Sequence, residues 1–117
     1  MEDIERGRLV WLKNVIDTRG KPTHPHCAVI LTTNADFNAG KPIKAAIISS
    51  KFDGKSADRI VKLRHMRGGH PQTGLDRPSA VICDWILDID EDDITRFGNI
   101  LYGSVLIDVL TKASTQS

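Results

Sequence analysis

The segment from Ser79 to Leu87 constrains the fold of this chain more than any other. It is the most apolar run of the sequence, is rich in β-branched residues and follows a turn-forming stretch with Gly74, Asp76 and Pro78. Its length and composition predict a strand that is buried on both faces. One charged residue, Asp84, interrupts it. Because a buried carboxylate is costly unless it is paired or solvated, we expect Asp84 to pair with an arginine, to lie at a kink or to face a cleft.

Five further segments have the apolar or alternating pattern of short strands. They are Arg8–Lys13, Cys27–Thr33, Ile43–Ser50, Arg59–Arg64 and Phe97–Leu101. Helical spacing of apolar residues from Tyr102 to Ala113 predicts a C-terminal amphipathic helix. The predicted fold class is therefore mainly β with minor α. It is a strongly bent antiparallel sheet or partly open β-barrel with a C-terminal helix, in one domain spanning residues 1–117.

The segments between these elements are polar and are expected to be mostly irregular. Asn14 to Pro25 is too broken for a helix and too long for a hairpin turn, so it is predicted to be a loop of the kind that carries binding groups. Asn34 to Lys41 is expected to form a turn or a short helix. His65 to Asp76 is glycine-rich and predicts a basic loop. Asp90, with Asp93 three residues later, predicts a capped helical turn.

The charges are divided unevenly along the chain. Residues 1–77 carry 14 Lys and Arg against 8 Asp and Glu, whereas residues 78–117 carry 2 against 7. All four histidines lie in the first part. A basic surface made by that part would attract a polyanion. The alternative is a dipolar protein whose two parts neutralise each other on folding.

Membrane proteins and disulfide-rich proteins are excluded by composition. No apolar run reaches the length of a membrane span and no signal-peptide pattern opens the chain, which predicts a cytoplasmic protein without a membrane partner. Cys27 and Cys83 lie in apolar runs and are expected to be buried, reduced side chains. Two cysteines do not make a disulfide framework.

A zinc site is the only metal centre that the sequence suggests. His24, His26 and Cys27 have the spacing of a zinc corner. Alternation along a strand, however, directs Cys27 away from His26, and further ligands would have to come from a loop. The sequence therefore predicts no metal and no other cofactor.

Several short motifs follow one another in an order that points to a known family. Gly7-Arg-Leu-Val-Trp11 and Asp17-Thr-Arg-Gly20 come first, followed by an apolar strand ending in Leu31-Thr32 and then by Phe37-Asn38. A strand ending in Ser49-Ser50, then Thr73-Gly-Leu, the Cys83-Asp84 strand and Ile89-Asp90 complete the series. From about Gly7 to Lys112, the chain resembles the PemK/MazF family of toxins from toxin–antitoxin systems.

The resemblance implies an SH3-like β-barrel, a homodimer and a metal-independent endoribonuclease that acts on single-stranded RNA and is restrained by an acidic antitoxin peptide. The family's reaction uses the 2′-hydroxyl of the RNA as nucleophile and leaves a 2′,3′-cyclic phosphate and a 5′-hydroxyl. It needs a base near the 2′-oxygen, an acid near the leaving oxygen and donors that stabilise a pentavalent phosphate.

Three residues stand at the family's catalytic positions. The resemblance places His26 where the family has the arginine of an Arg-Pro pair, Ser49 on its catalytic Thr or Ser, and Asp84 on the acid that some members use as a base. Ile82 replaces the arginine that precedes that acid in those members. A histidine exchanges protons near neutral pH but lacks the bidentate positive fork of an arginine. The resemblance thus implies weakened or altered activity.

Other cations are expected to replace the missing arginines and to hold RNA. The predicted RNA-binding residues lie in polar loops or at strand ends, and they are Arg19, Lys21, His24, Ser50, His65, Arg67 and His70. Arg19 or Arg67 is expected to complete one cleft with the three catalytic residues. Trp11 and Trp85 can stack on bases where exposed, but their place in apolar strands predicts core packing instead.

Two other functions fit parts of the pattern. One is a non-catalytic PemK-like protein that binds RNA or a peptide, which the absence of both arginines favours. The other is a gyrase-directed toxin like the CcdB proteins. Those proteins rely on a C-terminal helix that ends in tryptophan, whereas this chain ends in Ser114-Thr-Gln-Ser117.

Overall fold

Strand β7, Ser79–Ile89, is the longest strand in the described residues and lies between two other strands near one edge of the sheet. A computed structural model describes residues 4–71, 73–101 and 103–115 of the chain. In it, β7 pairs antiparallel with β5, Ile43–Ser49, on one side and with β6, Ile60–Leu63, on the other. Residues 79–83 are fully buried and residues 84–87 are half-buried. The predicted burial on both faces is therefore confirmed for the first half of the strand.

A bulge in β7 surrounds the charged residue Asp84. Ile47 of β5 pairs with Ile82, but the next residue, Ala46, pairs with Ile86. The three residues from Cys83 to Trp85 thus have no partner on β5, and a bulge of this kind bends a strand. The Asp84 carboxylate is able to leave the apolar layer at this bend and contacts Arg59.

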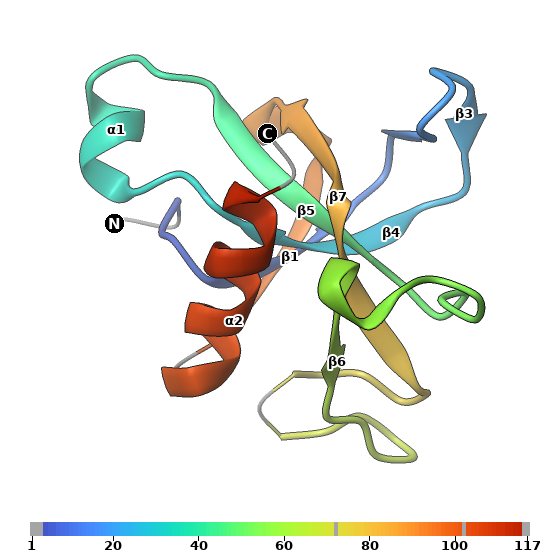
Figure 1. Cartoon of the computed structure of the whole chain (residues 1–117). Helices are drawn as coiled ribbons and strands as arrows, with labels where there is room; N and C mark the ends of the chain where they lie inside the picture. Colours follow the sequence, from blue (N-terminus) through green and yellow to red (C-terminus); the bar gives the residue numbers. More distant parts are fainter. Residues whose placement is uncertain (1–3, 72, 102, 116–117) are drawn as a thin grey trace.

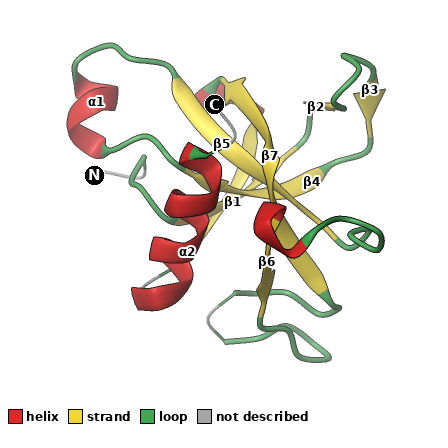
Figure 2. Ribbon diagram, in the orientation of Figure 1, coloured by secondary structure: helices red, strands yellow, loops and turns green. Residues whose placement is uncertain are grey.

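Three more strands extend the sheet beyond β5. They are β4, His26–Ile30, then β1, Arg8–Leu12, and β8, Ile94–Ile100. The order across the six strands is β6-β7-β5-β4-β1-β8, with antiparallel pairing throughout. The central strands β7, β5 and β4 lie side by side in Figures 1 and 2. In the described residues β6 and β8 remain separate edges, so the sheet is bent but not closed. The predicted antiparallel, partly open architecture is confirmed.

A small hairpin occupies most of the segment that was predicted to be a loop. Strands β2, Val15–Ile16, and β3, Pro22–Thr23, pair with each other and stand beside β4 (Figure 2). The turn is stabilised by the Asp17 carboxylate, which accepts hydrogen bonds from the backbone N–H groups of Arg19 and Lys21 at 2.8 and 2.9 Å. The prediction that this segment was too long for a hairpin was wrong, because an Asx-type turn absorbs the extra residues.

Of the three short helical elements in the described part of the chain, the first and the last lie where turns were predicted. Helix α1, Asn34–Asn38, is capped by Thr33, whose hydroxyl accepts a hydrogen bond from the Asp36 N–H. The 3₁₀ turn η1 spans Ala57–Arg59, and η2, Glu91–Asp93, begins with the predicted capping box of Asp90 and Asp93. Strand β8 begins at Ile94, three residues earlier than predicted, because η2 ends there.

Helix α2, Gly103–Ser114, packs across the part of the sheet formed by β6 and β7 (Figure 1). Val109 and Ala113 are its buried residues, and they join an apolar cluster on that face of the sheet. The Lys112 ammonium donates to the carbonyl oxygens of Ala57 and Ile60, each at 3.0 Å, and so ties the helix to β6. The predicted first helical residue, Tyr102, lies outside the described residues.

A second apolar cluster covers the opposite face of the central strands. It includes Val10, Ile30 and Ile47 and is continued by Ile4. Cys27 and Cys83 belong to the cluster under α2 as buried, free thiols, and burial raises the pKa of Cys27 to about 12 and that of Cys83 to about 11. They are therefore apolar packing groups, as expected. Within the described residues, no helix is long and apolar enough to cross a membrane.

Candidate functional site

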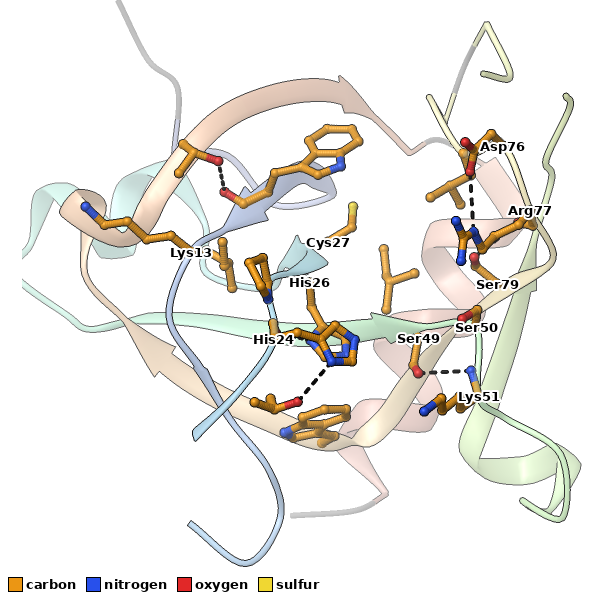
Figure 3. A pocket seen from close by; sticks show the side chains of 18 residues that line it. Lys13, His24, His26, Cys27, Ser49, Ser50, Lys51, Asp76, Arg77 and Ser79 are labelled. Atoms are coloured by element: carbon orange, nitrogen blue, oxygen red, sulfur yellow. Dashed lines mark hydrogen bonds and ion pairs between the residues drawn. The ribbon is translucent and has the colours of Figure 1, made fainter. Parts of the chain in front are cut away.

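A cleft of about 690 Å³ opens between the β2–β3 hairpin, the end of β5 and the loop that leads into β7 (Figure 3). Its lining combines buried apolar groups, among them Cys27, Ile48 and Leu75, with polar groups from three separate segments. Cys27 pairs with Ile48 between β4 and β5. His26 precedes Cys27 and Ser49 follows Ile48, so they adjoin the last pair of this register, and both line the cleft.

His26 is held by its neighbours on three sides. Its Nδ1 atom lies 2.7 Å from the carbonyl oxygen of His24. The imidazole rings of His24 and His26 stack with their centroids 4.3 Å apart. The rings of His26 and Trp85 meet edge to face, with their centroids 5.2 Å apart. The Trp85 indole is itself fixed, because its Nε1–H donates to the carbonyl oxygen of Ile16 at 2.9 Å. These contacts tie the hairpin, β4 and β7 together around one imidazole.

The hydrogen bond to His24 defines the tautomer of His26. A carbonyl oxygen only accepts hydrogen bonds, so Nδ1 carries the proton and the lone pair of a neutral ring lies on Nε2. Burial lowers the pKa of His26 below 6.5, and the nearby His24 and Lys51 act in the same direction, against the raising effect of the hydrogen bond. The ring is therefore mainly neutral at pH 7, and of the two directions of proton exchange open to a histidine this state favours accepting a proton.

Ser49 ends β5 at the rim of the cleft. Its Oγ accepts a hydrogen bond from the backbone N–H of Lys51 at 3.0 Å. This contact orients the hydroxyl and leaves its hydrogen to donate toward a bound group. Ser50, which was predicted to bind RNA, also lines the cleft (Figure 3).

Three cations for which the sequence predicted no role line the cleft: Lys13, Lys51 and Arg77 (Figure 3). The only carboxylate in this lining is Asp76, whose Oδ1 lies 3.6 Å from Arg77 Nε. Both partners are more than half exposed, so the pair is weak and the guanidinium can turn to another anion. Arg77 adjoins the proline before β7, and that junction was the available sequence signal.

Asp84 does not line this cleft. Its Oδ2 atom lies 3.4 Å from Arg59 Nη1, and its side chain is 27% exposed. The expectation of an arginine partner is confirmed, and so is the expectation of a kink. The structure therefore brings together His26 and Ser49 but places Asp84 apart from them, because the bulge turns Asp84 toward η1.

The predicted RNA-binding residues divide into two groups. His24 and Ser50 line the cleft, whereas Arg19 and Lys21 lie at the exposed tip of the hairpin whose base contributes Thr23 to the lining. His65, Arg67 and His70 lie in the loop between β6 and β7 and are not among the lining residues. Neither Arg19 nor Arg67 therefore stands beside His26 in this arrangement.

Metal binding finds no support in the donor set. Among the described residues, no group of three or more His, Cys, Asp or Glu side chains has the arrangement of a metal site. Cys27, the third member of the suggested zinc corner, is buried with its thiol pKa raised. These donors do not fit a zinc ion, which takes a deprotonated thiol.

The fold is a small, open antiparallel sheet with a C-terminal helix packed across its β6–β7 end and a basic cleft at the end of β5. Solved structures of MazF toxins have the same fold. No protein-family model and no curated protein sequence matches the chain.

Several solved structures are similar in fold to this chain. The Mycobacterium tuberculosis toxin MazF-mt6 is 20% identical, with 89% of this chain and 94% of that one covered and a TM-score of 0.61. A MazE–MazF complex from Deinococcus radiodurans is 20% identical over 97% of each chain, with a TM-score of 0.64. A mycobacterial endoribonuclease in complex with its cognate antitoxin is 15% identical over 96% of this chain and 92% of its own, with a TM-score of 0.65. The predicted resemblance is confirmed for the fold.

Proposed function

We propose that the chain is a MazF-like endoribonuclease that cleaves single-stranded RNA through the 2′-hydroxyl, without a metal ion. The observation that carries the proposal is the short contact between His26 Nδ1 and the His24 carbonyl, within a cleft lined by three cations. It leaves a neutral imidazole nitrogen beside groups that attract phosphate. The mycobacterial protein of similar fold is described as an endoribonuclease, which supports the same reaction class.

In the proposed reaction, His26 Nε2 accepts the proton of the 2′-hydroxyl. The 2′-oxygen attacks phosphorus, the bond from phosphorus to the 5′-oxygen breaks, and water protonates the leaving oxygen. The products are a 2′,3′-cyclic phosphate and a 5′-hydroxyl. Arg77 and Lys51 stabilise the charge that builds up on the phosphate, and the Ser49 hydroxyl donates to one of its oxygens. Asp84 is left without a part in this scheme.

The assembly and the partners follow from the same proposal. Two neighbours of similar fold were solved with an antitoxin, as MazE–MazF or as a toxin with its cognate antitoxin. We infer that an acidic antitoxin peptide competes with RNA for the basic cleft of this chain, and that the chain works as a homodimer in the cytoplasm. Sedimentation at micromolar concentration tests the dimer, and a monomer there would contradict it.

Cleavage of a mixed-sequence single-stranded RNA in EDTA tests the function. We expect fragments that end in a 2′,3′-cyclic phosphate, and no fragments from the same sequence with 2′-O-methyl groups. A requirement for added metal would reject the mechanism. Binding of RNA without cleavage would instead favour the non-catalytic RNA-binding alternative, which the absence of the two family arginines supports.

A further inference from the structure

The indole of Trp11 packs against two glycines, Gly98 and Gly74, where a side chain would crowd the ring. A Cβ atom at Gly98 would lie 2.6 Å from Trp11 Cζ3, and one at Gly74 would lie 3.3 Å from Trp11 Cη2. The indole therefore packs directly on the backbone of β8 and on that of the loop before β7. A side chain clamped in this way gives a rigid surface.

Arg96 covers this indole. Its guanidinium carbon lies 4.4 Å from the centroid of the Trp11 ring, and the two residues are paired neighbours on β8 and β1. Such a cation–π contact restricts the guanidinium to the plane above the ring. Arg96 is exposed and forms no ion pair within the described part of the chain. The outer side of the guanidinium is therefore open to a ligand.

This pair stands at the edge of the proposed active cleft. Trp11 lines the cleft, and it also lines a neighbouring hollow of about 210 Å³ together with Arg96 and Gly98. Arg96 interacts electrostatically with Cys27 in the cleft wall, and its positive charge opposes the rise in the pKa of that thiol. An RNA strand bound at His26 and Ser49 would thus have Trp11 and Arg96 within reach of an adjacent base.

We propose that Arg96, held over Trp11, is a nucleobase-stacking subsite that favours an unpaired purine next to the scissile phosphate. The inference rests on the proposed function, because it deepens the choice of substrate at the same cleft. Guanidinium planes stack on unpaired bases in RNA recognition. A purine presents the larger ring surface to the guanidinium, so it gains more from the contact than a pyrimidine.

Binding of short oligonucleotides separates stacking from charge. The probes are fluorescent 2′-O-methyl pentanucleotides that carry a central adenine, a central uracil or a central abasic unit, and their affinities are measured by anisotropy. The variant Arg96→Lys keeps the charge but loses the planar group. Arg59→Lys is the matched control, because Arg59 is exposed, does not line the cleft and pairs with Asp84.

We expect the wild type and Arg59→Lys to bind the adenine probe on the order of tenfold more tightly than the abasic probe, with uracil between them. Arg96→Lys should bring the three affinities together while leaving the abasic affinity unchanged. An unchanged adenine preference in Arg96→Lys, equal affinities in the wild type or no binding of any probe would overturn the inference. Base-dependent binding without cleavage of RNA would uphold this subsite and reject the endoribonuclease. Cleavage of RNA without base-dependent binding would uphold the endoribonuclease and reject this subsite.

Discussion

The imidazole of His26 donates from Nδ1 to the carbonyl oxygen of His24 across 2.7 Å, and the two rings stack. Because burial lowers the pKa of His26 below 6.5, the ring is a neutral base at pH 7. Protonation at low pH removes the lone pair on Nε2. We therefore expect the cleavage rate to rise with pH through a pKa below 6.5 and to reach a plateau above it, measured with a fluorescent RNA between pH 4.5 and 9.

Two substitutions distinguish this role from simple phosphate binding. His26→Ala should lower the rate on the order of a hundredfold, as expected for loss of a general base. His26→Arg places the family's residue at this position and should remove the acidic limb of the profile, since arginine stays charged over the whole range. A profile that falls toward high pH in the wild type would show that His26 donates a proton instead.

Ser49 is expected to act through its hydroxyl alone. Its Oγ already accepts from the Lys51 N–H, so the hydroxyl hydrogen is the group that it offers to phosphate. Ser49→Ala should lower the maximal rate on the order of a hundredfold, whereas Ser49→Thr keeps the donor and should stay within a few-fold of the wild type. Single-turnover kinetics at saturating enzyme measures the step directly. Equal losses in both variants would indicate packing rather than hydrogen bonding.

The sequence predicted the sheet well because its strands are bounded by turn residues and are apolar enough to be recognised singly. It predicted the site less well, because the cleft depends on side chains that come together only through pairing. His26 and Ser49 come together because they flank Cys27 and Ile48, the pair at the end of the β4–β5 register, which no local pattern reveals. Arg77 was not predicted to line the cleft, because its position beside Pro78 marks a turn but does not show which residues the loop faces.

Asp84 differs from His26 and Ser49, because its charge stands out in the sequence but serves an ion pair and not the cleft. The resemblance placed Asp84 on a catalytic acid, whereas its place in an apolar run also predicted an arginine partner or a kink. The structure shows the latter two, because the bulge turns the carboxylate to Arg59 at 3.4 Å. We expect Asp84→Asn to leave cleavage within about two-fold and to lower the free energy of unfolding by less than about 1 kcal/mol, as for a partly exposed ion pair. Urea denaturation and the cleavage assay check the two parts. A hundredfold loss of activity in a stably folded variant would return Asp84 to the catalytic group.

The cations of the cleft should determine how RNA binding depends on salt. If Arg77 contacts a phosphate, Arg77→Gln should weaken binding of all single-stranded sequences alike and lower the slope of log affinity against log salt by about 0.7, as for one released counterion. Lys44→Gln is the control, because Lys44 pairs with Asp88 at 2.8 Å and does not line the cleft. The slopes are measured by titrating the protein with a 2′-O-methyl RNA at salt concentrations from about 50 to about 300 mM. The same slope in Arg77→Gln and the wild type would remove Arg77 from the phosphate site.

The contact between Gly98 and Trp11 makes the last prediction, which concerns packing. A Cβ at position 98 would lie 2.6 Å from Trp11 Cζ3, so Gly98→Ala forces the indole out of its place. Overpacking of this kind costs about 1–3 kcal/mol, and we expect that loss in urea denaturation. Trp11→Phe shortens the ring system and removes the clashing atom. The double variant Gly98→Ala with Trp11→Phe should therefore be more stable than the sum of the two single changes predicts, since the residues are in contact. Simple additivity would mean that Gly98→Ala acts on the backbone of β8 and not through Trp11.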